Sequence, residues 1–339
     1  MNIFFLPKEL LHMDSQVVVI ENLKKYFHTK RGPVKAVDGV NLRVGAGEIF
    51  GFLGPNGAGK TTTLRILTTL LVPDSGDARI AGFDVKKHPD QVRLHIGYVS
   101  QAGGADRPAT GLENLILQGQ LYGMTTPTAR ARAQELIRLL DLSEFADRIV
   151  YTYSGGQRRR LDVALGLMNR PTILFLDEPT TGLDPQNRAN LWTQIQKLRQ
   201  EGTTIFLTTH YLDEADTLCD HIAIMDDGHI VAEGIPADLK KQVAGDCITI
   251  GMEHPAEKAP QLISLLRKAD FMREVKLDDN HMRLYVTDGA QAISEVLRLF
   301  AQEGVPMENI TLSAPSLDDV FLRQTGHSLR DINAQGVNV

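Results

Sequence analysis

Short apolar runs alternate with stretches of helical periodicity along the first part of the chain. Three examples are IFGFL at residues 49–53, TILFL at 172–176 and TIFL at 204–207. Runs of this length are typical of strands buried on both faces, as in parallel sheets. The pattern therefore predicts an α/β domain whose parallel sheet is covered on both faces. The other elements expected here are strands over 17–20 and 96–100, a polar connection over 24–32, and a helix over 64–71.

The segment from Ala102 to Met168 has few strand signals and several helical ones. Hydrophobic periodicity predicts helices over 114–122, 129–140 and 158–168. We interpret the segment as a helical subdomain inserted into the sheet domain.

After about Leu239 the pattern changes again. Strands are predicted over 246–250, 273–277, 282–286 and 309–312, with helices over 260–268 and 290–300. Their order is βαββαβ, the split pattern of a ferredoxin-like α+β domain. A last helix is expected over 317–324. The expected division is a leader over 1–16, a first domain over 17–243, an accessory domain over 244–326 and a tail over 327–339, with Met13 as an alternative start.

Composition adds limits to this picture. The chain has 339 residues, enough for two or three domains, and 42% of them are apolar. A net charge of -6 argues against a protein that coats nucleic acid. Cys219 and Cys247 have no metal-like spacing and favour a reducing compartment. No window reaches the ~18 to 20 apolar residues of a membrane span, so we expect a soluble protein or one that reaches a membrane through a partner.

The sequence GPNGAGKT, residues 54–61, has the spacing of a phosphate-binding P-loop between a predicted strand and a predicted helix. Glycines let the backbone wrap so that its N–H groups point at phosphate oxygens. Lys60 is placed for the β- and γ-phosphates of a nucleotide, and the Thr61 hydroxyl is placed for Mg²⁺. The predicted cofactor-binding residues are Gly54, Pro55, Asn56, Gly57, Ala58, Gly59, Lys60 and Thr61.

Polar residues follow the ends of three predicted strands, where ligands of α/β proteins bind. Asp177 is the candidate to hold Mg²⁺, and Glu178 is the candidate to polarise the attacking water. The alternative is that both acids cap the next helix. Gln101 is placed for both Mg²⁺ and the water, and we assign His210 to the γ-phosphate.

These motifs together resemble the ATP-binding subunits of ABC transporters. The resemblance rests on GPNGAGKTT at 54–62, Gln101, YSGGQ at 153–157, LFLDEP at 174–179, GLD at 182–184 and His210, in the family's order. It implies that residues 17–243 form a P-loop NTPase domain of the ABC type. Thr62 belongs to the matching motif and is counted with the nucleotide site.

The resemblance also implies a head-to-tail dimer with two ATP molecules between the subunits. In such a dimer the SGGQ residues, Ser154, Gly155, Gly156 and Gln157, face the γ-phosphate of ATP on the other subunit. A serine and backbone N–H groups at a helix N-terminus form an anion site. Asp184 matches the aspartate that links the two sites. Tyr26 matches the aromatic residue that stacks on adenine, although the adjacent Phe27 leaves a core role open for either ring.

The arginines at 158–160 form a short basic run. Because no aromatic residues are interleaved with them and the chain is negative overall, we interpret them as a solvated helix start or as salt-bridge partners. Nucleic acid is not expected as a partner.

Two further stretches look like the daunorubicin/doxorubicin-resistance exporter family. They are PTTGLDPQNR at 179–188 and APSLDDVFLRQTGHSL at 314–329. The resemblance implies a peripheral ATPase at the cytoplasmic face of the membrane, paired with ABC-2 type permease subunits that contact the helical subdomain. Drugs or other amphiphiles are the expected cargo, with polysaccharide, lipid or ion cargo as alternatives. The accessory domain stabilises or regulates the dimer, or is a passive appendage. One cassette and a short helical insert argue against DNA-repair and ribosomal relatives.

Overall fold

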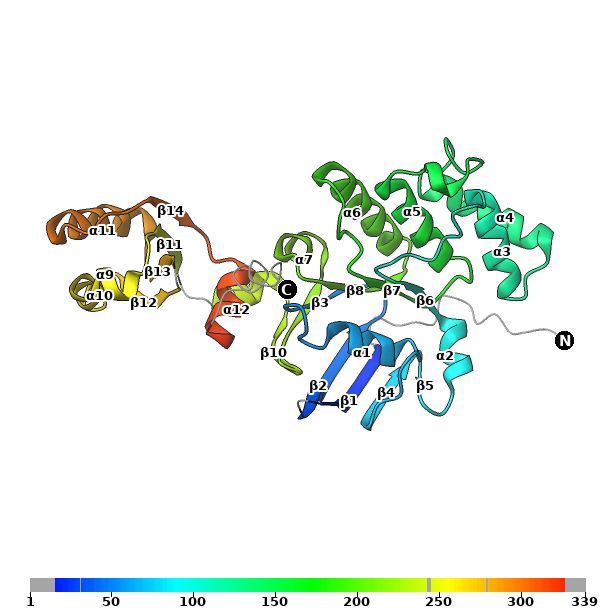
Figure 1. Cartoon of the computed structure of the whole chain (residues 1–339), viewed down its shortest axis with the longest axis horizontal. Helices are drawn as coiled ribbons and strands as arrows, with labels where there is room; N and C mark the ends of the chain where they lie inside the picture. The colour runs from blue at the N-terminus through cyan, green and yellow to red at the C-terminus, as the bar shows by residue number, and fades with distance from the viewer. Residues whose placement is uncertain (1–15, 31, 243–244, 279, 327–339) are drawn as a thin grey trace. The chain divides into compact units, whose positions relative to one another are not determined.

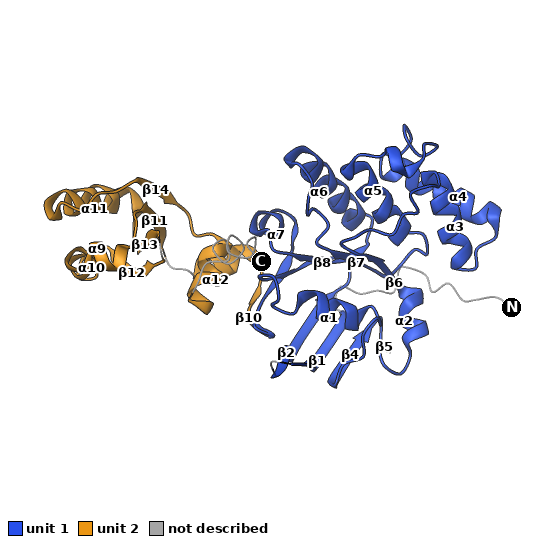
Figure 2. Ribbon diagram, in the orientation of Figure 1, with its two compact units in different colours: residues 1–230 blue, residues 231–339 orange. Residues whose placement is uncertain are grey.

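The computed structural model describes residues 16–30, 32–242, 245–278 and 280–326. The expected leader, apart from Gln16, and the expected tail lie outside these residues. The chain divides into two compact units, residues 1–230 and 231–339 (Figure 2). Each unit is described by itself below.

A six-stranded sheet lies at the centre of the first unit, and its edge strand β10 crosses the boundary at residue 230 (Figure 1). Its strand order is β10-β9-β3-β8-β7-β6, and the pairs from β9 to β6 are parallel. Every residue of β3, β7 and β8 is buried, which explains their uninterrupted apolar sequences. The predicted parallel sheet is confirmed. The strands are β3 (Ile49–Leu53), β6 (Ile96–Val99), β7 (Ile173–Asp177), β8 (Thr204–Thr209), β9 (His221–Asp226) and β10 (His229–Gly234).

Helices flank this sheet and connect its strands. They are α1 (Lys60–Leu67), α2 (Pro89–His95), α6 (Pro185–Gln200) and α7 (Leu212–Leu218). The expected helix over 64–71 was placed too late, because α1 begins at Lys60, within the P-loop itself. It ends before Thr69, whose φ of 63° belongs to the left-handed region.

A second, antiparallel sheet was not predicted. Its order is β2-β1-β4-β5, from β1 (Gln16–Thr29), β2 (Gly32–Gly45), β4 (Ser75–Ile80) and β5 (Phe83–Asp84). The expectation of a polar connection over 24–32 was wrong, because β1 continues through Thr29 and pairs with β2. Several register shifts in this pairing break the period-two alternation that normally reveals a strand.

The helical subdomain is confirmed within the first unit. Its helices are α3 (Gly111–Leu121), α4 (Thr126–Leu139) and α5 (Gly155–Gly166), with a short 3₁₀ turn over Val150–Thr152. They pack around a shared apolar core that includes Leu115, Leu136 and Leu161.

The second unit contains the predicted βαββαβ domain, with sheet order β12-β13-β11-β14. All neighbouring strands are antiparallel, and a buried cluster that includes Ile248, Leu284 and Phe300 forms the core. The ferredoxin-like prediction is confirmed. The elements are β11 (Asp246–Gly251), α9 (Pro255–Lys258), α10 (Pro260–Leu266), β12 (Met272–Leu277), β13 (His281–Val286), α11 (Gly289–Glu303) and β14 (Asn309–Ser313).

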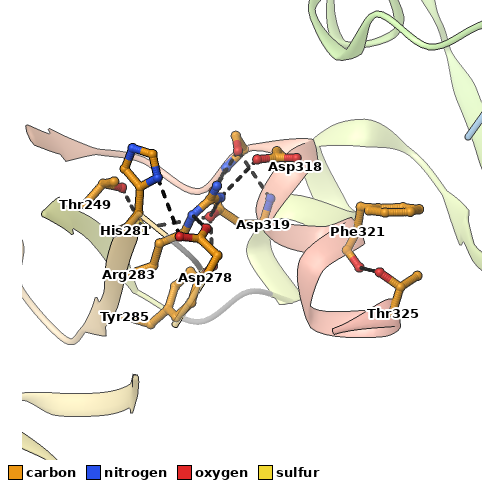
Figure 3. Close-up of polar contacts among 11 residues, drawn as sticks. Thr249, Asp278, His281, Arg283, Tyr285, Asp318, Asp319, Phe321 and Thr325 are labelled. Atoms are coloured by element: carbon orange, nitrogen blue, oxygen red, sulfur yellow. Dashed lines mark hydrogen bonds and ion pairs between the residues drawn. The ribbon is translucent and has the colours of Figure 1, made fainter. Parts of the chain in front are cut away.

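The last helix, α12 (Leu317–Thr325), is tied to this sheet by charged side chains (Figure 3). Arg283 of β13 lies 3.0 Å from Asp318 and 3.2 Å from Asp319. The Tyr285 hydroxyl donates to Asp319 at 2.7 Å. In the same unit, α12 packs on α8 (Pro236–Gln242), and Arg323 donates to the Gln242 carbonyl at 2.5 Å.

No helix in the described part of the chain is long and apolar enough to cross a membrane.

Candidate functional site: a phosphate loop facing a half-buried glutamate

The P-loop connects the end of β3 to the start of α1. Lys60 is the first residue of α1 and is 4% exposed. Its ammonium donates to the carbonyls of Gly54 at 2.6 Å and Pro55 at 2.9 Å. Burial lowers the pKa of Lys60, although the carboxylates of Glu178 and Asp177 act in the opposite direction. A cation held inside a glycine-rich loop is suited to phosphate groups.

Oxygen ligands meet at the end of β7. The Asp177 carboxylate is 4% exposed and accepts from the Thr208 hydroxyl at 2.7 Å. Its same oxygen lies 3.4 Å from the Thr61 hydroxyl of the P-loop. A carboxylate and a hydroxyl beside a phosphate site are the hard oxygen donors that Mg²⁺ prefers, so these residues fit a magnesium nucleotide.

Glu178 follows Asp177 directly, and side chains from several loops contact its carboxylate. Its Oε2 accepts from Gln101 Nε2 at 3.1 Å and from the Thr181 hydroxyl at 3.2 Å. Its Oε1 lies 3.3 Å from His210 Nδ1 and 3.9 Å from Lys60 Nζ. The structure therefore brings the catalytic candidates from three strand ends to one carboxylate.

The backbone and charge of Glu178 are both constrained. Its φ of 45° is unusual for a residue with a side chain. The backbone N–H is held by the Thr208 carbonyl at 3.1 Å. Burial raises the pKa of Glu178, but the nearby His210 ring and the charge of Lys60 outweigh it, so the net pKa is lowered. The carboxylate is ionised at neutral pH and is able to accept a proton.

Arg159 is a structural element of the site that the sequence did not reveal. The interpretation of residues 158–160 as a solvated or salt-bridged run was wrong here, because Arg159 is only 7% exposed. Its guanidinium donates to the carbonyls of Pro179 at 2.8 Å, Ser100 at 2.6 Å and Asp177 at 2.9 Å. It therefore ties together the two loops that carry Gln101 and Glu178.

The SGGQ residues form the first turn of α5. The Ser154 side chain accepts from the Gln157 N–H at 3.2 Å, and the Gln157 side chain accepts from the Ser154 N–H at 3.0 Å. This capping box satisfies two donors of the helix end. Within the described residues each of these side chains therefore accepts from the backbone N–H of the other residue, and no hydrogen bond to the P-loop is formed. Ser154 and Gly155 are exposed on the surface of the subunit.

The second glycine of SGGQ is required by packing inside the subunit. A Cβ on Gly156 would lie 2.3 Å from Asn187 Oδ1, whereas one on Gly155 would meet only Leu183 at 3.7 Å. Asn187 in turn donates its backbone N–H to Asp184 at 3.0 Å, which caps α6. Asp184 and SGGQ thus belong to one surface, formed by the starts of two helices.

Tyr26 lies on β1, opposite Lys35 of β2. Its ring is half-buried, and Lys35 Nζ lies 5.6 Å from its centroid. The neighbouring Phe27 points to the other face of the ribbon and is 39% exposed, so it is not part of the core.

Two family descriptions match the chain. The one described as ABC transporter covers residues 37–181. The one described as ATP-binding protein DrrA1-3-like, C-terminal domain, covers residues 234–325. The fold and the site therefore define the class as an ATP-binding cassette (ABC) ATPase with an accessory C-terminal domain.

Individual relatives extend this over almost the whole chain. The chain is 44% identical over 324 residues to the daunorubicin resistance ATP-binding protein DrrA2 of Streptomyces coeruleorubidus, covering 95% of this chain and 99% of that protein. It is 36% identical over 315 residues to the Nod factor export ATP-binding protein I of Ralstonia nicotianae, covering 93% and 95%. The chain belongs to the daunorubicin/doxorubicin resistance ATP-binding protein family.

One solved structure matches the cassette at a TM-score of 0.59 and 29% identity, covering 64% of this chain and 98% of that chain. It is the dimeric, post-hydrolysis state of the ATP-binding cassette MJ0796 bound to ADP and Pi.

Proposed function

We propose that this chain is the ATP-hydrolysing subunit of an ABC-2 type exporter, bound to permease subunits at the cytoplasmic face of the membrane. The observation that carries the proposal is the convergence of Lys60, Gln101 and His210 on the Glu178 carboxylate. Such an arrangement joins a phosphate-binding cation to a base in one site. The assignments of individual residues below are part of the proposal.

ATP is the substrate of the P-loop. The backbone of residues 54–62 surrounds the phosphates, and Lys60 exchanges its two carbonyl partners for phosphate oxygens. Thr61, Asp177 and Gln101 would hold Mg²⁺, which when bound neutralises charge on the phosphates. Tyr26 stacks on the adenine base.

Glu178 is the base of the hydrolytic step. It takes a proton from water as the water oxygen bonds to the γ-phosphorus and the bond to the ADP oxygen breaks. His210 keeps the carboxylate ionised and contacts the γ-phosphate, while Gln101 orients the water. The products are ADP and inorganic phosphate.

The catalytic site is completed by a second ATPase subunit. Ser154 and Gly155 are exposed at a helix N-terminus, where backbone N–H groups and the helix dipole favour an anion. The MJ0796 cassette is dimeric, which supports the same arrangement here. ATP therefore binds the closed pair more tightly than the open subunits, and hydrolysis removes that preference.

A groove between the end of β6 and the helical subdomain is suited to a permease segment. It has a volume of about 240 Å³ and is lined by Tyr98, Ser100, Gly103, Gln118, Tyr122 and Asp162. On α3, which supplies Gln118 to this region, Leu117 and Leu121 are 51% and 73% exposed. Asp162 accepts from the backbone N–H groups of Gly104 and Ala105, in the loop that follows Gln101. A permease segment bound there is thus connected to the catalytic glutamate.

The proposed cargo is a drug or similar amphiphile, because the 44%-identical relative is a daunorubicin resistance protein. The relative named for Nod factor export supports a non-drug cargo as the second candidate, for which polysaccharide, lipid or ion remain the alternatives. Cargo export by cells that express this chain with its permease distinguishes the two.

The test of the ATPase site compares three variants. Glu178→Gln keeps the shape of the side chain but removes the base, so it should bind ATP normally and hydrolyse it at least about 100-fold more slowly. Lys60→Ala should lose ATP binding itself. The control is Glu295→Gln, since Glu295 pairs only with Arg298 on the surface of α11 among its described contacts. Wild-type hydrolysis in Glu178→Gln would contradict the assignment.

A further inference from the structure

The backbone around Asp38 of β2 is packed directly against the P-loop. The Asp38 N–H donates to the Gly228 carbonyl at 2.9 Å, and the Gly228 N–H donates to the Ala58 carbonyl at 3.0 Å. A Cβ on Gly59 would lie 2.0 Å from the Ala36 carbonyl oxygen, so no side chain fits between the strand and the loop. The position of Asp38 relative to the phosphate site is therefore fixed by the backbone.

The Asp38 side chain is surrounded by donors. Its Oδ1 accepts from the Tyr26 hydroxyl at 2.5 Å, and its Oδ2 accepts from Lys35 Nζ at 2.9 Å. Lys24 Nζ and His229 Nε2 approach the carboxylate at 4.0 and 3.7 Å. The Asp38 side chain is 13% exposed, whereas that of Lys35 is 61% exposed. The Asp38 carboxylate is thus more shielded from solvent than the Lys35 ammonium that it binds.

This network restrains the Tyr26 ring. The hydroxyl is held by Asp38, and Lys35 lies over the ring while bound to the same carboxylate. The hydrogen bonds from Tyr26 and Lys35 hold the pKa of Asp38 below its usual range. A charged acceptor forms stronger hydrogen bonds than a neutral one. Without it, the ring would be free to rotate about its χ angles, and stacking on a base would then have to restrict it.

We propose that Asp38 is a positioning residue that holds the Tyr26 ring beside the P-loop, ready to stack on the base of the bound nucleotide. The proposal rests on the proposed function, because it takes the P-loop as the phosphate site. Asp38 acts through Tyr26 and does not itself contact the phosphates. Its contribution is therefore confined to the part of the ligand that carries the base.

The test measures binding of Mg-ATP and of Mg-tripolyphosphate, which lacks the base and the ribose, by titration calorimetry. Tyr26→Phe keeps the ring and removes the hydroxyl, while Asp38→Ala removes the acceptor. Each change should weaken ATP binding about 3- to 10-fold, the loss expected when one aromatic side chain must be ordered on binding. The double variant should be no weaker than Asp38→Ala alone, because both changes remove the same contact. Affinity for tripolyphosphate should stay unchanged in all three.

Two controls make the outcomes distinct. Asp90→Ala removes an exposed carboxylate from α2 and should change nothing. Asp38→Asn retains an acceptor oxygen and should recover part of the affinity, which keeps the test valid if Asp38→Ala folds poorly. An equal loss of ATP and tripolyphosphate binding would show that Asp38 only supports the P-loop, and additive losses would show that it does not act through Tyr26. If instead Lys60→Ala kept full affinity for both ligands, the nucleotide site itself would be misplaced and the proposed function would fail.

Discussion

At the residue scale, the charged side chains of Glu178 and Arg159 lie largely out of solvent, and each contacts specific partners in the site. Glu178 receives contacts from Lys60, Gln101, Thr181 and His210. Burial favours the protonated form of a carboxylate that has no partners, so these contacts keep the proposed base ionised. Arg159 is satisfied differently, by three backbone carbonyls around the same loops.

Replacing Arg159 by Met should therefore damage both stability and hydrolysis. The change removes the guanidinium donor from three carbonyls, of which those of Asp177 and Pro179 are buried, and we expect it to cost about 2–4 kcal/mol of the free energy of unfolding. ATP turnover should fall as well, because the loops of Gln101 and Glu178 lose their common anchor. The matched control is Arg160→Met, since Arg160 donates to the single carbonyl of Asp141 and is partly exposed. Urea unfolding of both variants measures the difference, and equal losses would contradict this role.

At the element scale, the sequence predicted the strands that are buried along their whole length. The strands that end at Leu53 and Asp177 are buried on both faces, so an apolar run was sufficient. The β1–β2 ribbon was missed because its outer part carries half-exposed side chains such as Lys24 and Lys25 and is interrupted by register shifts. The structural role of Arg159 was missed because the sequence does not distinguish an arginine that donates to backbone carbonyls from one that is exposed to solvent.

The link between α12 and its sheet predicts a measurable change in thiol reactivity. Cys247 of β11 is buried, and its Sγ lies 3.8 Å from Asp319. Burial raises the pKa of this thiol to about 12, so it should resist labelling at pH 8. Arg283→Gln removes the charge that pairs with both aspartates, which should loosen α12 by about 3–5 kcal/mol and expose the thiol.

The measurement is the rate of Cys247 labelling in a Cys219→Ala background. Arg283→Gln should react many times faster than its parent, whereas the control Arg273→Gln, on the exposed side of β12, should not. Equal rates in the two variants would show that α12 is held mainly by its apolar contacts, which include the buried Phe321.

At the scale of the whole molecule, the account requires two subunits for each active site. A substitution at Gly155 can test this requirement without disturbing folding. A methyl group there would make only an ordinary van der Waals contact with Leu183 of the same subunit. Gly155 is also the first residue of α5, so an alanine there does not interrupt the helix. Gly155→Ala should therefore keep or slightly raise stability and keep ATP affinity in the isolated subunit, yet lose most hydrolysis. Full activity in this variant would argue against a phosphate contact at Gly155, and Gly156→Ala should destabilise the subunit through Asn187.

The most direct test of the central claim asks whether SGGQ of one subunit reaches the P-loop of another. Two variants, Ser154→Cys and Asn56→Cys, are mixed in the Glu178→Gln background and treated with a short bifunctional thiol reagent. Both positions are exposed, whereas the thiols of Cys219 and Cys247 have pKa values raised by burial and should remain unreactive. The account predicts a mixed cross-linked dimer that forms with ATP and disappears without nucleotide. Absence of that product at saturating ATP, in the presence of the permease partner, would contradict the account.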